Sequence, residues 1–269
     1  MSVTDSGRRI VGTWETPVNR WQAAPNSIHN DAVAKRIGMR GGTIPGTAHL
    51  SWFRPVMNEL FGEAWLRRGS ISAFYTYATL DGEKVRVIAD SPDGTSDVLV
   101  NAQIENEEGK TVLKGTLACG SPESVSYVRG LPLEDAPRSE IRILADMSSG
   151  METPVRERYL VETGGEGGEI RDPQEMYRAL AVFPTGVDLG GAVGFFGATE
   201  IGLRAGPIRL ATAYRKTGRV ACVGASPKTE FAWFDSWLHD ESGQLIAEMR
   251  HMTRWMKASS SRWTGSSGH

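Results

Sequence analysis

The chain has 269 residues, of which 40% are hydrophobic and 23% are charged, and its formal net charge is −2. This composition is typical of a globular protein, and the near-neutral charge argues against nucleic acid as a partner, because nucleic-acid binding needs a basic surface. Apolar runs fall short of the roughly 20 residues that cross a bilayer, so we expect no membrane association.

Cysteine usage and the first residues predict the compartment. Cys119 and Cys222 lie in strand-like runs and lack the spacing of a metal site, which indicates buried thiols in a reducing environment. Residues 1–9 contain no apolar stretch of the kind found in secretory signals. We therefore expect a cytoplasmic protein without a metal.

The first half of the chain predicts helices followed by strands. A short helix is expected at Asp31–Ile37, and apolar residues at helical spacing predict a longer one from Thr47 to Phe61, bent at Pro55 and ended by Gly62. The pattern then changes to a period of two, which is typical of strands. These strands are expected at residues 71–77, 85–88, 98–101 and 112–117.

The second half predicts a similar order of elements. A helix rich in glycine and alanine is expected near Val187–Ile201. Strands are expected to follow at Ile208–Tyr214, Val220–Val223, Thr229–Leu238 and Leu245–Trp255. Between the halves, the segment from Gly120 to Gly150 is rich in Pro, Ser and Gly and is expected to be irregular, with a short strand at Ile141–Leu144.

Short motifs occur once in each half and predict an internal repeat. The run from Leu66 to Ile71 resembles the run from Leu203 to Ile208, and a glycine hinge near each final strand pair recurs at Gly109 and Gly243. Two copies favour a covalent pseudo-dimer. We expect a first unit at 1–135, a linker at 136–150, a second unit at 151–258 and a disordered tail at 259–269.

The loop before the longer helix carries the most specific motif. It reads Asn26-Ser27-Ile28-His29-Asn30-Asp31, followed by Ala34, Gly38 and Ile44-Pro45-Gly46. This pattern resembles that of the MaoC-like dehydratases, the (R)-specific enoyl-CoA hydratases. The resemblance implies an α+β double hot-dog fold, in which two curved antiparallel sheets each wrap a long central helix and pack as a pseudo-dimer.

The resemblance also implies roles for individual residues. His29 would be the acid–base residue, Asn26 its orienting neighbour, and the backbone N–H of Gly46 the donor to the thioester oxygen. We also expect His49, Thr47 and Asp31 to contact the substrate, although His49, a helix residue beside Trp52, would more often belong to the core or an interface. Asp31 at a helix start is better explained as a cap. No cofactor is implied beyond coenzyme A or an acyl carrier protein as the carrier of the thioester.

The motif departs from the family at the position of its catalytic Asp, which holds Ala24 here. Asp31 and Asp188 are candidates to replace that carboxylate. Tyr177 would either line an acyl tunnel or pack in the core, and His239 and His251 are expected at the surface or between the units.

Three functions follow from these observations. The first is an enoyl or 3-hydroxyacyl thioester hydratase/dehydratase, and the second is a diverged thioesterase, lyase or cyclase. The third is a subunit that binds acyl thioesters without catalysis. The expected ligand is a small-molecule acyl thioester in each case, and the sequence leaves open whether two pseudo-dimers associate into a homodimer.

Overall fold

The framework of the protein is one antiparallel β-sheet. The computed structural model describes residues 4–5, 9–92, 94, 97–162 and 168–265, and within them eleven strands pair in the order β1-β2-β4-β5-β6-β3-β8-β11-β10-β9-β7. The strands of the first half are β1 Thr4–Asp5, β2 Arg9–Val11, β3 Gly69–Tyr75, β4 Val85–Asp90, β5 Val98–Asn106 and β6 Thr111–Cys119. Those of the second half are β7 Arg156–Leu160, β8 Gly194–Leu203, β9 Ala213–Ala225, β10 Thr229–His239 and β11 Leu245–Met256.

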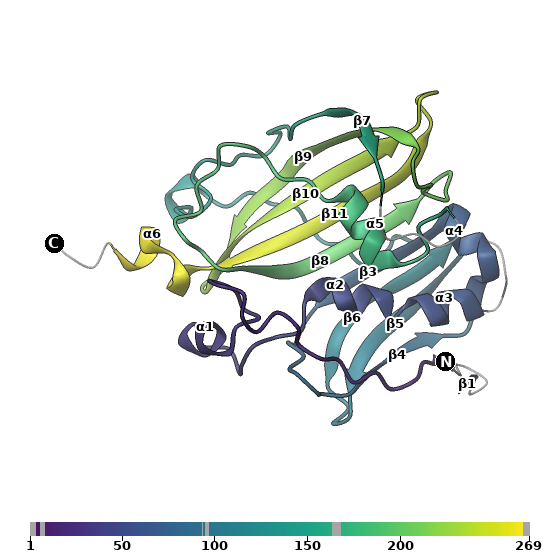
Figure 1. Cartoon of the computed structure of the whole chain (residues 1–269), viewed down its shortest axis with the longest axis horizontal. Coiled ribbons are helices and arrows are strands. Elements are labelled where there is room, and N and C mark those ends of the chain that lie inside the picture. The colour runs from purple at the N-terminus through teal and green to yellow at the C-terminus, as the bar shows by residue number, and fades with distance from the viewer. Residues whose placement is uncertain (1–3, 6–8, 93, 95–96, 163–167, 266–269) are drawn as a thin grey trace.

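The two halves meet where β3 pairs with β8 in the middle of the sheet (Figure 1). On either side of this seam the strands repeat in a mirrored order, from β3 to β6, β5 and β4 and from β8 to β11, β10 and β9. The largest apolar cluster draws residues from both halves, including Phe53 and Met57 from one and Met176 and Ile201 from the other. The predicted pseudo-dimer is therefore present, with a shared core.

The internal repeat is confirmed in one part and corrected in another. Gly109 and Gly243, with φ of 74° and 85°, occupy equivalent turns between β5 and β6 and between β10 and β11. Gly69 and Gly206 are not equivalent, because Gly69 opens β3 whereas Gly206 follows the end of β8. The two motifs instead touch across the seam, where the N–H of Gly206 donates to the carbonyl of Arg67 at 3.0 Å.

The helical segment of the first half agrees with its sequence pattern. It consists of α2 (Gly46–Ser51) and α3 (Arg54–Phe61), with the expected break before Pro55, which lies in the first turn of α3. Gly62, with φ of 55°, ends α3, and a 3₁₀ turn (Gly62–Ala64) and α4 (Trp65–Arg68) lead into β3. The short helix α1 spans Asp31–Arg36.

The predictions for the start of the second half are wrong in two places. The helix of this half is α5 (Pro173–Leu180), whereas the segment near 187–201 forms a turn followed by β8. Gly197 lies in this strand, where a Cβ would approach the side chains of Met252 and Arg254 on β11. The strand expected at Ile208–Tyr214 is mostly irregular, since Ala211 has φ of 52° and β9 begins at Ala213.

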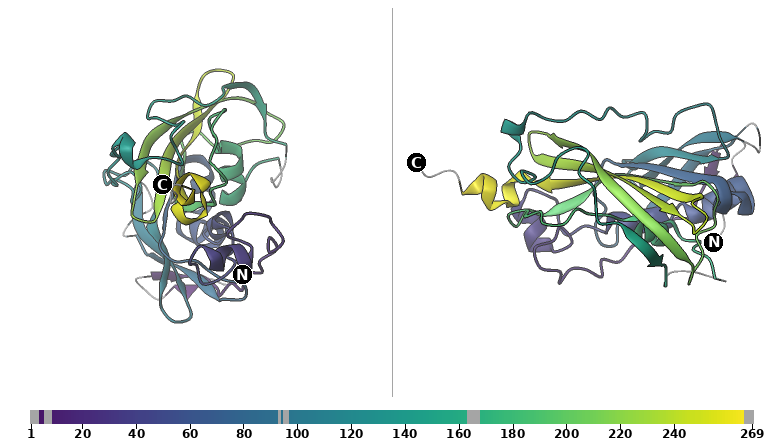
Figure 2. Two further views of the ribbon diagram at one scale, coloured as in Figure 1. Left: turned by 90° about the vertical axis from the view of Figure 1, so that its left-hand side faces the viewer. Right: turned by 90° about the horizontal axis from the view of Figure 1, so that it is seen from above.

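The helices and the linker cover opposite faces of the sheet. Figure 2 shows α2, α3 and α5 within the concave side and the segment between β6 and β7 crossing the other side. The strand expected at Ile141–Leu144 does not form there, although Ile143 and Leu144 are fully buried. The backbone N–H groups of residues 142–144 donate instead to the buried carboxylate of Glu230, at 2.9–3.0 Å. A 3₁₀ turn, Arg138–Glu140, precedes them.

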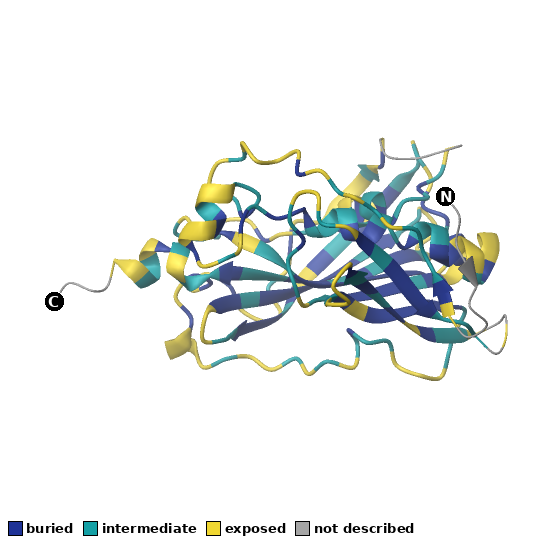
Figure 3. Cartoon of the chain, turned by 90° about the horizontal axis from the view of Figure 1, so that it is seen from below, coloured by how far each residue is buried: buried dark blue, intermediate teal, exposed yellow. Residues whose placement is uncertain are grey.

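The tail predicted to be disordered from residue 259 is ordered as far as Gly265. A 3₁₀ turn (Lys257–Ser259) leads into α6 (Ser261–Thr264), and the indole N–H of Trp263 donates to Glu230 at 2.6 Å. Residues 266–269 lie outside the described part of the chain. Figure 3 shows how the buried residues concentrate along the strands while the exposed ones lie at their ends and in the connecting segments.

Candidate active site

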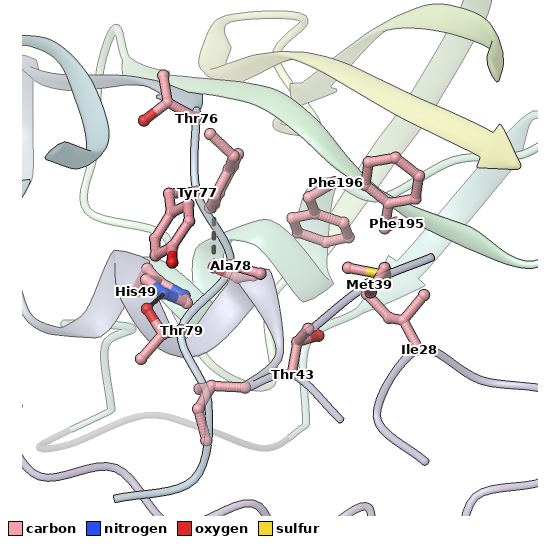
Figure 4. A pocket seen from close by; sticks show the side chains of 13 residues that line it. Ile28, Met39, Thr43, His49, Thr76, Tyr77, Ala78, Thr79, Phe195 and Phe196 are labelled. Carbon is pink, nitrogen blue, oxygen red and sulfur yellow. Dashed lines mark hydrogen bonds between the residues drawn. The ribbon is translucent and has the colours of Figure 1, made fainter. Parts of the chain in front are cut away.

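Two cavities lie next to each other at the seam, and both are bounded by Ile28, Gly46, Phe195 and Phe196. The first, here called the His49 cavity, has a volume of about 220 Å³ and is completed by Met39, Thr43, Ile44, His49, Tyr75 and residues 76–79. The second, the His29 cavity, has a volume of about 370 Å³ and is completed by His29, Pro45, Thr47, Tyr177, Gly194 and Thr253. Figure 4 shows the His49 cavity, with His49 beside Tyr77 and Thr79 and the two phenylalanines beside Met39.

The ring of Phe196 on β8 belongs to the walls of both cavities. It packs directly on the start of α2, where a Cβ on Gly46 would approach its Cδ2 atom to 2.7 Å. It also contacts the rings of Tyr177 and His251, with centroid separations of 4.8 and 4.3 Å. Glycine at position 46 thus permits an approach between helix and ring that any side chain would prevent.

The imidazole of His29 is held in one tautomer. Its Nδ1 lies 2.7 Å from the carbonyl oxygen of Thr43, and because a carbonyl only accepts, Nδ1 carries the proton. Nε2 is then left with an unshared electron pair, and it bonds to none of the described residues. Partial burial lowers the pKa of His29, so the ring is neutral at neutral pH. A neutral imidazole with an unshared electron pair on Nε2 can accept a proton, as a general base does.

His49 has a structural role in the wall of the other cavity. It is 3% exposed, its Nδ1 lies 3.1 Å from the carbonyl of Pro45, and its Nε2 lies 3.0 Å from the hydroxyl of Thr79. Burial lowers the pKa of His49 to about 4. Because both ring nitrogens are already bonded to protein atoms, neither is available to a ligand.

The start of α2 borders both cavities through Gly46, and Thr47 borders the His29 cavity. Pro45 precedes the helix and offers no side-chain cap. The first amides of a helix have no partner within the helix and carry partial positive charge. The Tyr75 hydroxyl donates to the carbonyl of Gly46 at 2.9 Å, which fixes the position of this turn.

Two predicted site residues lie outside both cavities. Asn26 is exposed, has φ of 49°, and donates from its amide to the carbonyl of Gly191 at 2.9 Å. Asp31 forms an ion pair with Lys35 at 2.6 Å and is exposed. The preferred interpretation of Asp31 as a helix cap is wrong, because Asn30 caps α1 by accepting from the N–H of Val33 at 3.1 Å.

Neither candidate carboxylate approaches His29 from within a cavity. Asp188 is exposed, pairs with Arg262 at 3.0 Å and accepts from the N–H of Gly190 at 2.9 Å. Among the described residues, the walls of the two cavities contain no Asp or Glu. The polar side chains that share the His29 cavity with His29 are Thr47, Tyr177 and Thr253.

Sequence analysis missed the contribution of β8 and β11. His251, expected at the surface or between the units, is 4% exposed at the seam, 2.9 Å from the hydroxyl of Thr199 and 3.1 Å from that of Thr253. Burial lowers the pKa of His251 to about 3. Phe195 and Phe196 are not predicted as site residues either, because the sequence predicts a helix in their segment. In the structure they belong to β8, which brings Phe196 beside His251.

Comparisons with known proteins agree with this architecture. No family model and no curated protein matches the sequence. The dehydratase domain of PpsC from Mycobacterium tuberculosis, solved with C12:1-CoA, matches with a TM-score of 0.54 at 12% identity over 94% of this chain and 97% of that one. The dehydratase domain of a mycocerosic acid synthase-like polyketide synthase matches at 0.52, with 11% identity over 97% and 94% of the two chains. A putative MaoC domain protein dehydratase from Chloroflexus aurantiacus matches at 0.51, with 10% identity over 94% and 96%.

These matches show the fold: the chain is an α+β double hot-dog, as the sequence predicts. Within the described residues, no helix is both long and apolar enough to pass through a membrane. That same part of the chain holds no cluster of three or more His, Cys, Asp or Glu side chains placed to bind a metal ion.

Proposed function

We propose that the chain binds an acyl thioester at the seam and acts as a hydro-lyase that interconverts enoyl and 3-hydroxyacyl thioesters. The fold is that of dehydratase domains, one of which was solved with C12:1-CoA. The observation that carries the proposal is the state of His29, whose Nδ1–H is fixed on Thr43 and whose Nε2 is free in a cavity beside the start of α2.

In the direction of dehydration, Nε2 of His29 removes the proton from the α-carbon of a 3-hydroxyacyl thioester. The electron pair forms the α–β double bond as the bond from the β-carbon to the hydroxyl oxygen breaks. The imidazolium then delivers its proton to the departing oxygen, and water leaves. Hydration is the reverse. One base therefore serves both proton transfers, which suits a site whose described walls hold no carboxylate.

Negative charge develops on the thioester oxygen during this reaction. The backbone N–H groups at Gly46 and Thr47 open α2 without a side-chain cap and border the same cavity as His29. Donors fixed in advance at the position of developing charge lower the barrier, because they need no reorganisation. The apolar part of the acyl chain would contact Ile28, Phe195 and Phe196, and no cofactor beyond the thioester carrier is required.

The test is hydration of crotonyl-CoA and of a longer enoyl-CoA, followed by loss of the ultraviolet absorbance of the conjugated thioester. We expect His29→Ala to lower the rate by about 10²–10⁴, the usual contribution of one general acid–base group. His239→Gln, on β10 outside the walls of both cavities, is the matched control and should keep the rate. Hydration that survives His29→Ala unchanged would refute the assignment.

A second candidate function is binding of acyl thioesters without catalysis. It is favoured by the walls of the His29 cavity, which bring aromatic rings and hydroxyl groups rather than a carboxylate to the imidazole. Measurable binding of a saturated acyl-CoA, together with absence of hydration and of thiol release, would support this alternative. Thiol release from acyl-CoA would instead identify a thioesterase.

A further inference from the structure

Tyr177 is a partly buried phenol in the wall of the His29 cavity, and its hydroxyl has no hydrogen-bond partner among the described residues. It projects from α5, the helix of the second half, whereas His29 comes from the first. Its ring is fixed by Phe196, at a centroid separation of 4.8 Å, and by His251, at 5.0 Å in an edge-on contact. Its hydroxyl bonds to none of the described residues, and it is not among the fully enclosed polar atoms that lack a partner. The oxygen therefore keeps accessible surface, in a residue that lines the His29 cavity.

A tyrosine hydroxyl in such a position usually finds a partner, because an unpaired polar group in an apolar environment is costly. Here the ring is held by Phe196 and His251, the hydroxyl has no partner among the described residues, and Tyr177 lines the same cavity as His29. A ligand with an oxygen near the reacting carbons would supply the partner.

We propose that the hydroxyl of Tyr177 donates a hydrogen bond to the 3-hydroxyl oxygen of a 3-hydroxyacyl thioester bound in the His29 cavity. This rests on the proposed function and specifies its substrate class. Tyr177 stays neutral throughout the reaction: His29 takes the α-proton and returns it to the leaving oxygen, while the phenol stabilises the charge that grows on that oxygen as its bond to carbon breaks.

The surroundings of Tyr177 agree with a neutral donor. Burial raises the pKa of Tyr177, so it does not ionise near neutral pH. Its titratable neighbours include His251 on β11, Tyr75 on β3 and His29 in the same cavity wall. Burial lowers the pKa values of the two histidines and raises the pKa of Tyr75, so all three are uncharged at neutral pH. No charged side chain stands among the described walls of this cavity.

The experiment compares Tyr177→Phe with the wild-type chain, using two ligands that differ by one hydroxyl, 3-hydroxybutyryl-CoA and butyryl-CoA. Phenylalanine keeps the ring that packs on Phe196 and His251. We expect the affinity for 3-hydroxybutyryl-CoA to fall roughly three- to tenfold, as for loss of one neutral hydrogen bond, while that for butyryl-CoA is unchanged. In turnover, kcat should fall about 10²–10³, with KM changed far less. Tyr127→Phe, outside both cavities, is the control.

The outcomes separate this inference from the proposed function. Equal weakening of both ligands, or no change in either, overturns the role of Tyr177 while leaving His29-dependent turnover standing. A wild-type chain that binds neither ligand overturns both proposals. A third outcome is that Tyr177→Phe weakens binding of 3-hydroxybutyryl-CoA only, while the wild-type chain performs no hydration. This outcome supports recognition of the hydroxyl by Tyr177 and contradicts only the proposed hydro-lyase activity.

Discussion

Mild acid should destabilise this protein through two histidines at the seam. His49 and His251 are 3% and 4% exposed, and burial lowers their pKa values to about 4 and about 3, against 6.5 in an unfolded chain. Between the folded and unfolded values the unfolded state binds more protons, so the free energy of unfolding falls as the pH drops below 6.5. Only well above pH 6.5 do the histidines no longer lower the free energy of unfolding.

The size of the effect follows from the separation of the pKa values. At pH 5 an unfolded histidine is almost wholly protonated, while both buried rings are still neutral. Each of the two histidines therefore lowers the free energy of unfolding by about 2 kcal/mol relative to pH 7. Together they remove about 4 kcal/mol, a large share of the roughly 5–15 kcal/mol that stabilises a typical domain. His29, whose pKa is also lowered, acts in the same direction.

The assay is urea unfolding at pH 7, 6 and 5. Carboxylates with lowered pKa values, such as Asp135, lose their contribution mainly below pH 4, so this range isolates the histidines. His49→Gln and His251→Gln should each reduce the difference between pH 7 and pH 5 by about 2 kcal/mol, whatever they do to stability at pH 7. If the double variant keeps the full pH dependence of the wild type, the reasoning is wrong.

Two further substitutions test whether the Phe196 ring separates the two cavities and whether Glu230 holds the segment between β6 and β7 in place. Phe196→Ala should join the two cavities, cost about 1.5–3 kcal/mol of stability, and shift kcat/KM from crotonyl-CoA toward a twelve-carbon enoyl-CoA. An unchanged chain-length preference would contradict that separation. Glu230→Gln should cost about 2–5 kcal/mol in urea unfolding, because its carboxylate accepts from three backbone N–H groups and from Trp263. A loss below about 0.5 kcal/mol would argue against that anchor.

The sequence predicts the first half better than the second for a physical reason. The spacing of Leu50, Phe53 and Met57 reports a helix because that helix packs one apolar face into the core. In β8, glycines stand where β11 side chains approach closely, and such glycines remove the side-chain pattern that identifies a strand. The glycine- and alanine-rich segment near Val187–Ile201 therefore resembles a buried helix with small residues, although it contains β8.

The candidate site divides in the same way. His29 and Gly46 stand in one short loop and helix start, so a local motif can find them. Tyr177, Phe196 and Thr253 reach the same cavity from three elements of the other half, and only the pairing of β3 with β8 brings them there. A contact made by the tertiary fold leaves no spacing in the chain for sequence analysis to detect.

The pseudo-symmetry of the fold relates the starts of α2 and α5, and the two differ in their side-chain caps. At α5, Pro173 has no N–H, and Asp172 accepts from the N–H of Gln174 at 2.8 Å, so the helix supplies its own negative cap. The hydroxyl of Ser51 also donates to Asp172, at 2.7 Å. At α2, Pro45 caps with no side chain, and the first amides border the cavity of His29. The uncapped helix and the free imidazole thus belong to the same half of the chain, and the second half contributes the wall that faces them.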